Sequence, residues 1–378
     1  MPAPSPTIQV ITNPAALAAL APAWNDLAAA TGNPQLHHDW IATAAQSFFS
    51  ADQLRVVVLR DGDTLLAAAP LVQVGSGWSR QLVAVGHYDL YEPTDFLYRT
   101  AADLGPLVAA VAGLGLPARL YRVPADGAVA RAAWPGGAPW AGPVADRPTS
   151  SPYLDIVSDW AAFEAGLKSR TRNDLSRARR RAERRGTLDC VFHLAEPDTV
   201  DSLLSRFLDV ERRSWKLRNG SAITSERRLH GFFVRFTRRA AASGGLHFAF
   251  LDLDGRPVAA QMFQVRHDRL WIYKIAFDMA LAEVSPGNLL THQVVRFAFD
   301  AGLRGVEFLG ASEPWLDKWT GGVRRQVDLA WYPPTALGLA RRLRDRSPAV
   351  RRGADALRLA KGLARGLARG LKRRLAGR

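Results

Sequence analysis

The chain has 378 residues, 48% of them hydrophobic, one cysteine and a formal net charge of +15. This length suits two domains, and the apolar fraction is sufficient for two cores. The sequence has no apolar run of about 18 residues that could span a bilayer, no secretory-signal pattern at its start and no second cysteine for a disulfide, so we expect a cytoplasmic protein.

The positive charge is confined to two segments. Residues 341–378 contain fourteen Arg or Lys against two Asp, and residues 168–185 contain nine against two acidic residues. The remainder of the chain is slightly acidic. An evenly basic surface, as expected for a nucleic-acid-binding domain, is therefore not predicted.

The first half of the chain predicts one α/β unit. Apolar periodicity predicts helices over 14–31, 38–49 and 101–114, and strands over 54–60, 64–74 and 80–85. Asp61-Gly62, between two apolar runs, is typical of a tight hairpin. The segment 124–152 is rich in Pro, Gly and Ala and predicts a linker, so we place the first domain at 1–150.

The second half has clearer boundaries. Helices are predicted from Trp160 through the Arg run to Gly186, over about 203–211, and from an N-cap at Ser225 to Gly244. Strands at 246–253, 258–265 and 270–277 follow in immediate succession and predict an antiparallel meander. A turn at 285–288 leads into a helix that ends at Gly302, and strands follow at 306–309 and 323–331. We place this domain at 151–335 and a basic tail at 336–378.

This order of elements resembles that of the GNAT acyltransferases. Short sequence segments of the second half resemble those of the CelD/BcsL-type branch, which is associated with cellulose and exopolysaccharide. The matching segments are Leu175–Arg185 with Gly186, Glu211–Lys216, Leu253–Ala260, Tyr273–Asp278, Ser285–Leu290, and Phe308–Gly310 leading to Asp317–Trp319. FemAB-type peptidyltransferases share the paired arrangement. The resemblance implies an α/β fold of two tandem GNAT-like domains, each a mixed, mostly antiparallel sheet flanked by helices, the first degenerate, followed by a basic helical tail.

The turn after the meander is the predicted donor site. A strand that splays from its neighbour before a helix N-terminus offers free backbone N–H groups and a positive dipole end to a pyrophosphate. The alternative is a simple helix start, because Ser caps helices and Pro suits their first turn. The predicted site, for acetyl-CoA or another acyl-CoA, consists of Ser285, Pro286, Gly287, Asn288, Leu289 and Leu290.

One departure from the GNAT pattern bears on the donor. The usual loop has Arg or Gln, then Gly three residues later, then Gly or Ala two residues after that. Here these positions are Ala282, Ser285 and Gly287, so the side chain that helps to enclose the pyrophosphate is absent. This leaves aminoacyl-tRNA, used in the FemAB manner, as an alternative donor.

Four charged residues are candidates for catalysis or substrate binding. Lys274 and Asp278 are four apart on the last meander strand and should share a sheet face, either in a polar cleft or as a structural ion pair. Lys318 is a candidate for binding an anionic donor or acceptor. Glu211 lies at an inward helix position, as a general base or as a helix-face partner.

Metal binding and the basic tail complete the predictions. The eight His residues are scattered without the spacing of metal ligands, so no metal site is predicted. Between 353 and 378, leucines recur every fourth residue among cations, which suits an anionic membrane surface contacted through 351–378. A flexible solubilising tail and an RNA-binding arm are the competing interpretations of this segment.

These observations predict a cytoplasmic acyltransferase, with the tail placing it at the inner membrane face. It would move an acyl group from acyl-CoA to an amine or hydroxyl of a cell-envelope or polysaccharide precursor. A FemAB-like aminoacyl-tRNA-dependent peptidyltransferase is the first alternative, and the only one in which nucleic acid is a partner. A non-catalytic, membrane-tethered binding protein is the second.

Overall fold

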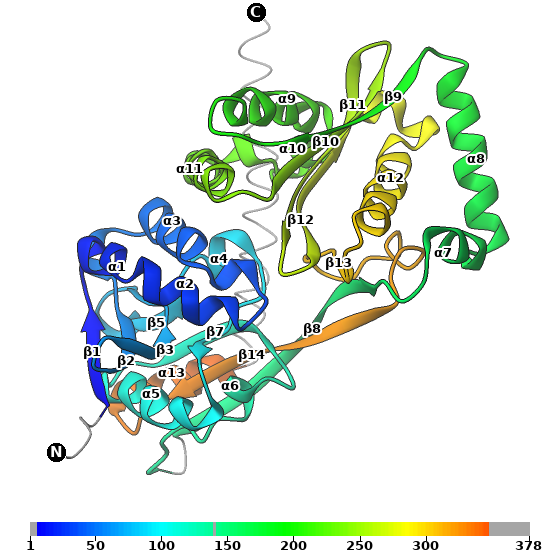
Figure 1. The fold of residues 1–378 in the computed structure, drawn as a ribbon. Coiled ribbons are helices and arrows are strands. Elements are labelled where there is room, and N and C mark those ends of the chain that lie inside the picture. The colour runs from blue at the N-terminus through cyan, green and yellow to red at the C-terminus, as the bar shows by residue number, and fades with distance from the viewer. Residues whose placement is uncertain (1–5, 139–140, 348–378) are drawn as a thin grey trace, which may run out of the picture. The chain divides into compact units, whose positions relative to one another are not determined.

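The computed structural model describes residues 6–138 and 141–347 (Figure 1). These residues divide into two compact units. The first takes the described residues up to Ser151 and those from Arg324 onward, and the second takes Pro152–Val323. The segment 351–378, predicted to contact a membrane, lies outside the described residues.

The first unit contains two groups of strands with helices packed on them. One sheet has the order β1-β2-β3-β6, and β4, β5, β7 and β14 are neighbours in a second sheet. The strands are β1 (Thr7–Ile11), β2 (Val56–Asp61), β3 (Thr64–Ala69), β4 (Leu71–Val74), β5 (Gln81–Ala84), β6 (Leu97–Tyr98), β7 (Ala118–Pro124) and β14 (Gly322–Tyr332). The helices are α1 (Pro14–Ala19), α2 (Ala21–Ala29), α3 (His38–Phe48), α4 (His87–Leu90), α5 (Ala101–Gly113), α6 (Ala128–Arg131) and α13 (Ala336–Arg346).

Most predicted elements of the first unit are present, with two subdivided. The β2–β3 hairpin turns at Asp61-Gly62 as predicted, with Asp61 paired to Thr64. The predicted helix over 14–31 is two helices that meet at Leu20, and the predicted strand over 64–74 is broken at Pro70 into β3 and β4. Pro lacks the N–H that a continuous ladder needs, which explains the second break.

The prediction of a linker over 124–152 is wrong. This segment contains α6 and most of β8 (Gly142–Asp155). In its sheet, β8 is the neighbour of β14 and of β13 (Gly305–Glu307). Because these partners are distant in sequence, local composition gave no sign of the strand.

The chain passes between the two units twice, and at the second passage the unit boundary differs from the predicted domain limit. The second domain was placed at 151–335, whereas residues from Arg324 onward belong to the first unit. There β14 pairs with β7, with Val327 opposite Val123 and Leu329 opposite Leu120. The second unit is therefore an insertion between two parts of the first.

The second unit is a sheet with helices on both faces (Figure 1). Its strand order is β8-β13-β12-β11-β10-β9. The remaining strands are β9 (Leu188–Leu194), β10 (Leu246–Leu253), β11 (Arg256–Arg266), β12 (Arg269–Phe277) and β13 (Gly305–Glu307). Helices α9 (Val200–Arg213), α10 (Trp215–Asn219) and α11 (Arg227–Ser243) lie on one face, with α12 (Pro286–Asp300), α8 (Ser169–Glu183) and α7 (Trp160–Gly166) on the other.

The meander β10-β11-β12 is antiparallel throughout, as predicted. Its turns are tight because Asp254, Gly255, His267 and Asp268 all have positive φ, the geometry of two-residue hairpins. The helix predicted from Trp160 to Gly186 is instead two helices, α7 and α8, because Leu167 is extended. The N-cap of α11 is Glu226 rather than Ser225.

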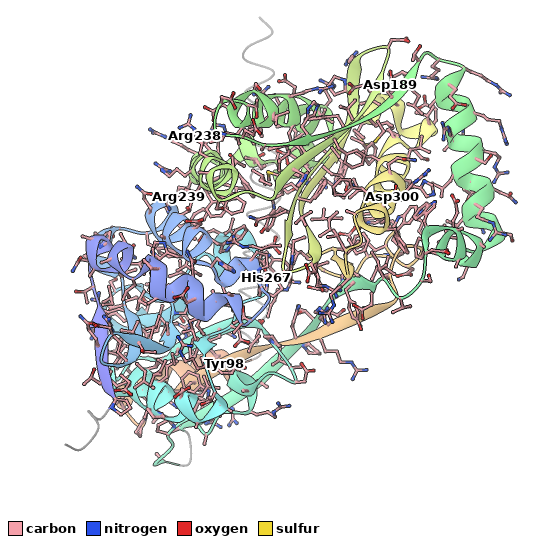
Figure 2. The ribbon with its side chains drawn as sticks, viewed as in Figure 1. Tyr98, Asp189, Arg238, Arg239, His267 and Asp300 are labelled. Carbon is pink, nitrogen blue, oxygen red and sulfur yellow. The ribbon has the colours of Figure 1, made fainter. Side chains whose placement is uncertain are left out.

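The core of the second unit lies between the meander and α12. Leu290, Val294 and Ala298 recur along one face of α12 and are fully buried with Phe263 and Leu270 of the strands. Side chains fill this layer, while Asp300 marks the exposed end of α12 (Figure 2). Among the described residues, no helix is both long enough and apolar enough to cross a membrane.

Candidate functional site

The site forms where β12 loses one of its neighbours. β12 pairs with β11 along its whole length, but with β13 only at residues 269–271. A β-bulge at Tyr273 follows, where the partner of Met262 is Lys274 and that of Phe263 is Ile272. Bulges terminate or redirect strand pairing. The far half of β12 therefore presents one free edge.

A cavity of about 460 Å³ lies beside this free edge. It is enclosed by the end of β12, the start of α12 and two loops, and its walls are mainly apolar with a few polar groups. Its lining comprises Trp215, Gln261, Ile275, Ala276, Phe277, Met279, Ala282, Ser285, Gly287, Asn288, Leu290, Thr291, Glu313 and Trp315. This size and character are typical of small-molecule sites.

The start of α12 forms one wall of the cavity. Ser285 is its N-cap, in the left-handed region with φ of +50°. A Cβ on Gly287 would lie 2.9 Å from Phe277 Cδ1, so the close approach of helix and strand requires glycine there. The N–H groups of Asn288 and Leu289 donate to the Ser285 carbonyl, whereas that of Gly287 has no acceptor within the described chain.

Lys318 lies against the same helix start. Its Nζ donates to Asn288 Oδ1 at 3.2 Å. Burial lowers the pKa of Lys318, and Asp174 on α8 opposes this shift. A primary ammonium next to a helix N-terminus concentrates positive charge at one point, which suits an anion. The structure thus brings together Lys318 and Asn288, which are thirty residues apart in sequence.

The predicted donor residues divide between two faces of α12. Ser285, Gly287, Asn288 and Leu290 line the cavity, together with Ala282, whose short side chain is also in the wall. Leu289 instead lines a second cavity, on the other face of the helix. Pro286 is buried and contributes to neither lining.

Glu211 lies away from this cavity in the packed layer under α9. Its side chain is fully buried, Oε2 accepts from the Ile223 backbone N–H at 2.7 Å, and Oε1 lies 3.6 Å from Lys216 Nζ. Burial lowers the pKa of Lys216 to about 8, although Glu211 raises it. Glu211 is thus held by one hydrogen bond at Oε2 and one ion pair at Oε1, which are contacts of a structural carboxylate.

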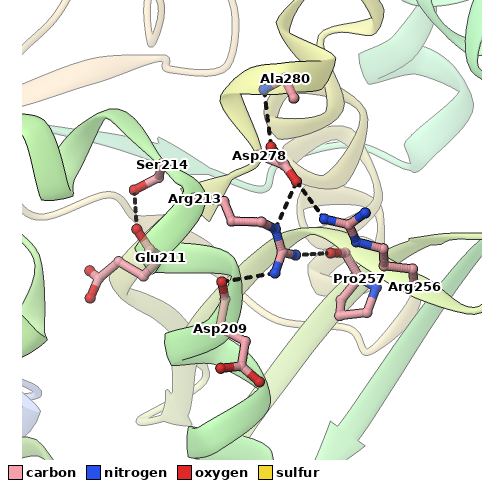
Figure 3. Close-up of polar contacts among 8 residues, drawn as sticks. All are labelled: Asp209, Glu211, Arg213, Ser214, Arg256, Pro257, Asp278 and Ala280. Atoms are coloured by element: carbon pink, nitrogen blue, oxygen red, sulfur yellow. Dashed lines mark hydrogen bonds and ion pairs between the residues drawn. The ribbon is translucent and has the colours of Figure 1, made fainter. Parts of the chain in front are cut away.

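Asp278 connects β12, β11 and α9 (Figure 3). Its Oδ2 lies 2.7 Å from Arg213 Nε and 3.3 Å from an Arg256 guanidinium nitrogen, and its Oδ1 accepts from the Ala280 N–H at 3.0 Å. Arg213 also donates to the Pro257 carbonyl at 2.6 Å. These bonds fix the end of β12, so Asp278 holds the strand that forms the cavity wall.

Lys274 does not pair with Asp278. Its Nζ lies 5.2 Å from the Phe233 ring centroid, on the face covered by α11. The neighbouring Tyr273 contacts Phe236 of the same helix. Because of the bulge, the successive residues Tyr273 and Lys274 both face α11. Lys274 and Asp278 lie toward the same sheet face, which carries α9 and α11, but they contact different helices.

Several cavity residues were not singled out from the sequence. Among the described residues of the lining, Glu313 alone carries a carboxylate, and its Oε2 accepts from Trp315 Nε1 at 2.8 Å. Trp215 packs against Phe277, with ring centroids 4.8 Å apart and the rings tilted by 41°. Glu313 and Trp315 lie in a segment with little regular structure, so neither periodicity nor spacing identified them.

The chain was compared with known families and structures. Residues 169–316 match the model described as "Acetyltransferase (GNAT) domain". No curated protein matches. A conserved protein of unknown function from Bacteroides thetaiotaomicron has a TM-score of 0.52 and 13% identity, over 86% of this chain and 100% of that one. FemX has a TM-score of 0.52 and 10% identity, over 86% and 96%.

A tandem GNAT protein from the clavulanic acid biosynthesis pathway is also similar, with a TM-score of 0.43 and 14% identity over 86% of this chain and 98% of that one. At these identities the structural similarities concern the fold alone. The match to the acetyltransferase domain confirms the acyltransferase class, and together with the fold shared with FemX it confirms the predicted mixed α/β, GNAT-like fold. The matched segment contains the meander, the start of α12 and Glu313.

Proposed function

We propose that the second unit transfers an acyl group from an acyl-CoA to an amine or hydroxyl, with the donor bound in the cavity beside β12. The observation that carries this proposal is the positive charge gathered at the start of α12, which forms one wall of that cavity. The helix N-terminus, with the free N–H of Gly287, supplies one part of it, and the ammonium of Lys318, bonded to Asn288 Oδ1, supplies the other. Together they suit the pyrophosphate of coenzyme A.

The remaining cavity suits the rest of the donor. Ile275, Phe277, Trp215 and Trp315 give apolar walls for a pantetheine arm and its acyl group. Beyond Trp271, β12 is not paired with β13, and we place the thioester carbonyl against the backbone of its end, where Ile275, Ala276 and Phe277 line the cavity. Donors held ready for the developing oxyanion stabilise the transition state of acyl transfer.

Glu313 is the general base in this proposal. The acceptor nitrogen or oxygen attacks the thioester carbonyl carbon, and the Glu313 carboxylate takes the proton that the nucleophile loses. The tetrahedral intermediate then collapses, the C–S bond breaks, and CoA leaves with the bonding electron pair. Glu313 suits this role because it is a carboxylate in the cavity wall with one oxygen not bonded to Trp315.

The acceptor class rests on the resemblance to the CelD/BcsL-type branch. That resemblance favours a cell-envelope or polysaccharide precursor carrying an amine or hydroxyl. The basic tail would hold the enzyme at the inner membrane face, near such precursors. The match to an acetyltransferase domain favours a transferase over the non-catalytic tethered binder.

Calorimetric titration of the full-length chain with acetyl-CoA and octanoyl-CoA tests the donor. Asn288→Asp places a carboxylate where the pyrophosphate should bind and should weaken binding at least tenfold. Lys318→Ala should weaken it about tenfold, the usual loss for one charge-assisted contact. Lys168→Ala, an exposed lysine on the same unit, is the matched control and should bind as the wild type does.

An aminoacyl-tRNA donor is the second candidate. The observation that favours it is Ala282, which lines the cavity without the Arg or Gln side chain that would enclose a pyrophosphate. If neither acyl-CoA binds the wild-type protein, transfer from CoA is wrong. Retention of charged over uncharged tRNA by the same protein would then support this alternative.

A further inference from the structure

A second cavity lies in the same unit, between α8, α12 and the outer strands of the sheet. Its volume is about 330 Å³. The proposed transfer does not use it. Its lining comprises Glu164, Leu167, Arg172, Leu175, Ser176, Arg179, Leu188, Cys190, Leu251, Leu289, His292 and Gln293.

The α8 wall of this cavity carries a surplus of positive charge. Arg172 and Arg179 both line it, and Glu164 is the one carboxylate among the described residues of its wall. Glu164 Oε1 is bonded to His292 Nε2 at 3.0 Å. Burial lowers the pKa of His292, and Arg179 contributes to this shift. The Glu164 carboxylate is therefore bonded to His292 and not to either of the two guanidinium groups.

The two arginines are held in place while keeping donors free. One terminal nitrogen of Arg172 donates to the carbonyls of Ala165 and Leu167 at the end of α7, which leaves its other nitrogens available. Arg179 uses Nε for Glu183 at 2.7 Å, which leaves its terminal nitrogens available. A guanidinium fixed by one bond and open on its other side binds phosphate or carboxylate well.

Ser176 adds a hydroxyl to this polar wall. Its Oγ accepts from Arg180 at 2.8 Å, so its own hydrogen can be donated into the cavity. Successive turns of α8 place Arg172, Ser176 and Arg179 on one face, at spacings of four and three residues. Three donors thus lie along the one face of α8 that lines the cavity.

The other walls are apolar. Leu175, Leu188 and Leu251 come from α8, β9 and β10, and Leu289 comes from α12. Burial raises the pKa of the Cys190 thiol to about 12, so it stays uncharged and acts as a small apolar group. A cavity of about 330 Å³ has room for a small organic molecule.

We propose that this second cavity binds a small organic anion, with a phosphate or carboxylate head at Arg172 and Arg179 and a short apolar body against the leucines. The site is separate from the donor cavity. Gly287, Asn288 and Thr291 of α12 line the donor cavity, whereas Leu289, His292 and Gln293 line the second cavity. The inference therefore does not depend on the proposed acyl transfer.

Calorimetric titration of the full-length protein with hexyl phosphate tests the site, with hexanoate, inorganic phosphate and 1-hexanol as comparison ligands. We expect hexyl phosphate to bind at least tenfold more tightly than inorganic phosphate, because the alkyl chain is buried. Hexanol, which lacks the charge, should not bind measurably. Comparable binding of hexanoate and hexyl phosphate would support a general anion site, and strong preference for either would identify the head group.

The variants locate this binding. Arg172→Gln with Arg179→Gln should weaken hexyl phosphate binding at least tenfold. Arg181→Gln, an exposed arginine of α8 outside the lining, is the matched control and should change nothing. If the double variant fails to fold, Ser176→Asp places a repelling carboxylate at an exposed helix position and should have the same effect.

Two results would overturn the proposal. One is equal affinity of the wild type and a folded cavity variant for hexyl phosphate. The other is equal affinity of the wild type for inorganic phosphate and hexyl phosphate, since the cavity would then contribute nothing beyond surface charge. Titration with acetyl-CoA in parallel shows whether a variant has disturbed the donor cavity, which this proposal expects to be unaffected.

Discussion

On the two faces of the sheet around β12, the carboxylates differ in burial and in the number of protein groups that contact them. On the α9 side, Glu211 and Asp278 are buried and held by hydrogen bonds and ion pairs from other protein groups. On the α12 side, Glu313 lies in the wall of an open cavity with one internal partner. The sequence motifs drew attention to the first pair. A carboxylate in a recognisable motif is therefore as readily a structural group as a reacting group.

Replacing Glu313 should have the largest effect on activity. Under the proposed mechanism, Glu313→Gln removes the proton acceptor and should reduce turnover by about 10²- to 10⁴-fold, with little change in acetyl-CoA affinity. Release of CoA thiol with amino-sugar acceptors measures it. Glu283→Gln, at an exposed carboxylate paired with Arg185, is the control. Full activity in the Glu313 variant would show that another group takes the proton.

Replacing Glu211 should affect stability instead. Glu211→Ala leaves Lys216 buried without its counter-charge and the Ile223 N–H without an acceptor, so we expect a loss of about 3 kcal/mol in the free energy of unfolding. Chemical denaturation measures it. Asp201→Ala removes an exposed ion pair with Arg238, a residue labelled in Figure 2, and should cost below about 1 kcal/mol. Equal losses of stability in the two variants would contradict the assignment of Glu211 as a structural carboxylate and of Asp201 as a member of a surface ion pair.

Asp95 extends the comparison to a carboxyl that no cation among the described residues contacts. Burial raises its pKa from 3.8 to about 7, against the bond from the Phe96 N–H. Between these pH values the folded state holds a proton that the unfolded state has released, so this group's contribution to stability falls as pH rises from about 4 to 7.

Asp95→Asn should remove this pH dependence. Relative to the wild type, we expect the free energy of unfolding of the variant to increase by about 2 kcal/mol between pH 4 and 7. A fully buried carboxyl would give a larger increase, but Asp95 is partly exposed. Denaturation at a series of pH values measures the difference, with Asp126→Asn, at an exposed position, as the control. Parallel curves for the wild type and the Asp95 variant would mean that the carboxyl titrates normally.

Gly287→Ala should give the smallest effect. The added Cβ would meet Phe277 at 2.9 Å, which costs packing energy, while alanine favours the helix. We expect a net loss of about 1 kcal/mol in stability, measured by thermal denaturation. Gly166→Ala, where a Cβ would have open space, should not be destabilising. No loss at Gly287 would show that helix and strand can move apart at the cavity.

The sequence by itself determined the local elements and the position of the helix start that faces the cavity. Alternating apolar residues and Asp-Gly turns predicted the meander, because strand alternation and positive φ are properties of neighbouring residues. Gly287 could be identified for the same reason, as a glycine between a strand and a helix. The bulge at Tyr273, which sends Lys274 to the α11 face, lay beyond such patterns, since it depends on the register against β11.

Only the tertiary structure decided which charges are buried and which face open space. Glu211 acquires its contacts from Lys216 and Ile223, and Asp278 from two arginines, so their burial is settled by residues outside their own strand or helix turn. Lys318 reaches Asn288 across thirty residues, and Glu313 enters the cavity wall from an irregular segment. Local periodicity specifies which face of an element is apolar, whereas packing of distant elements decides where a cavity remains between them.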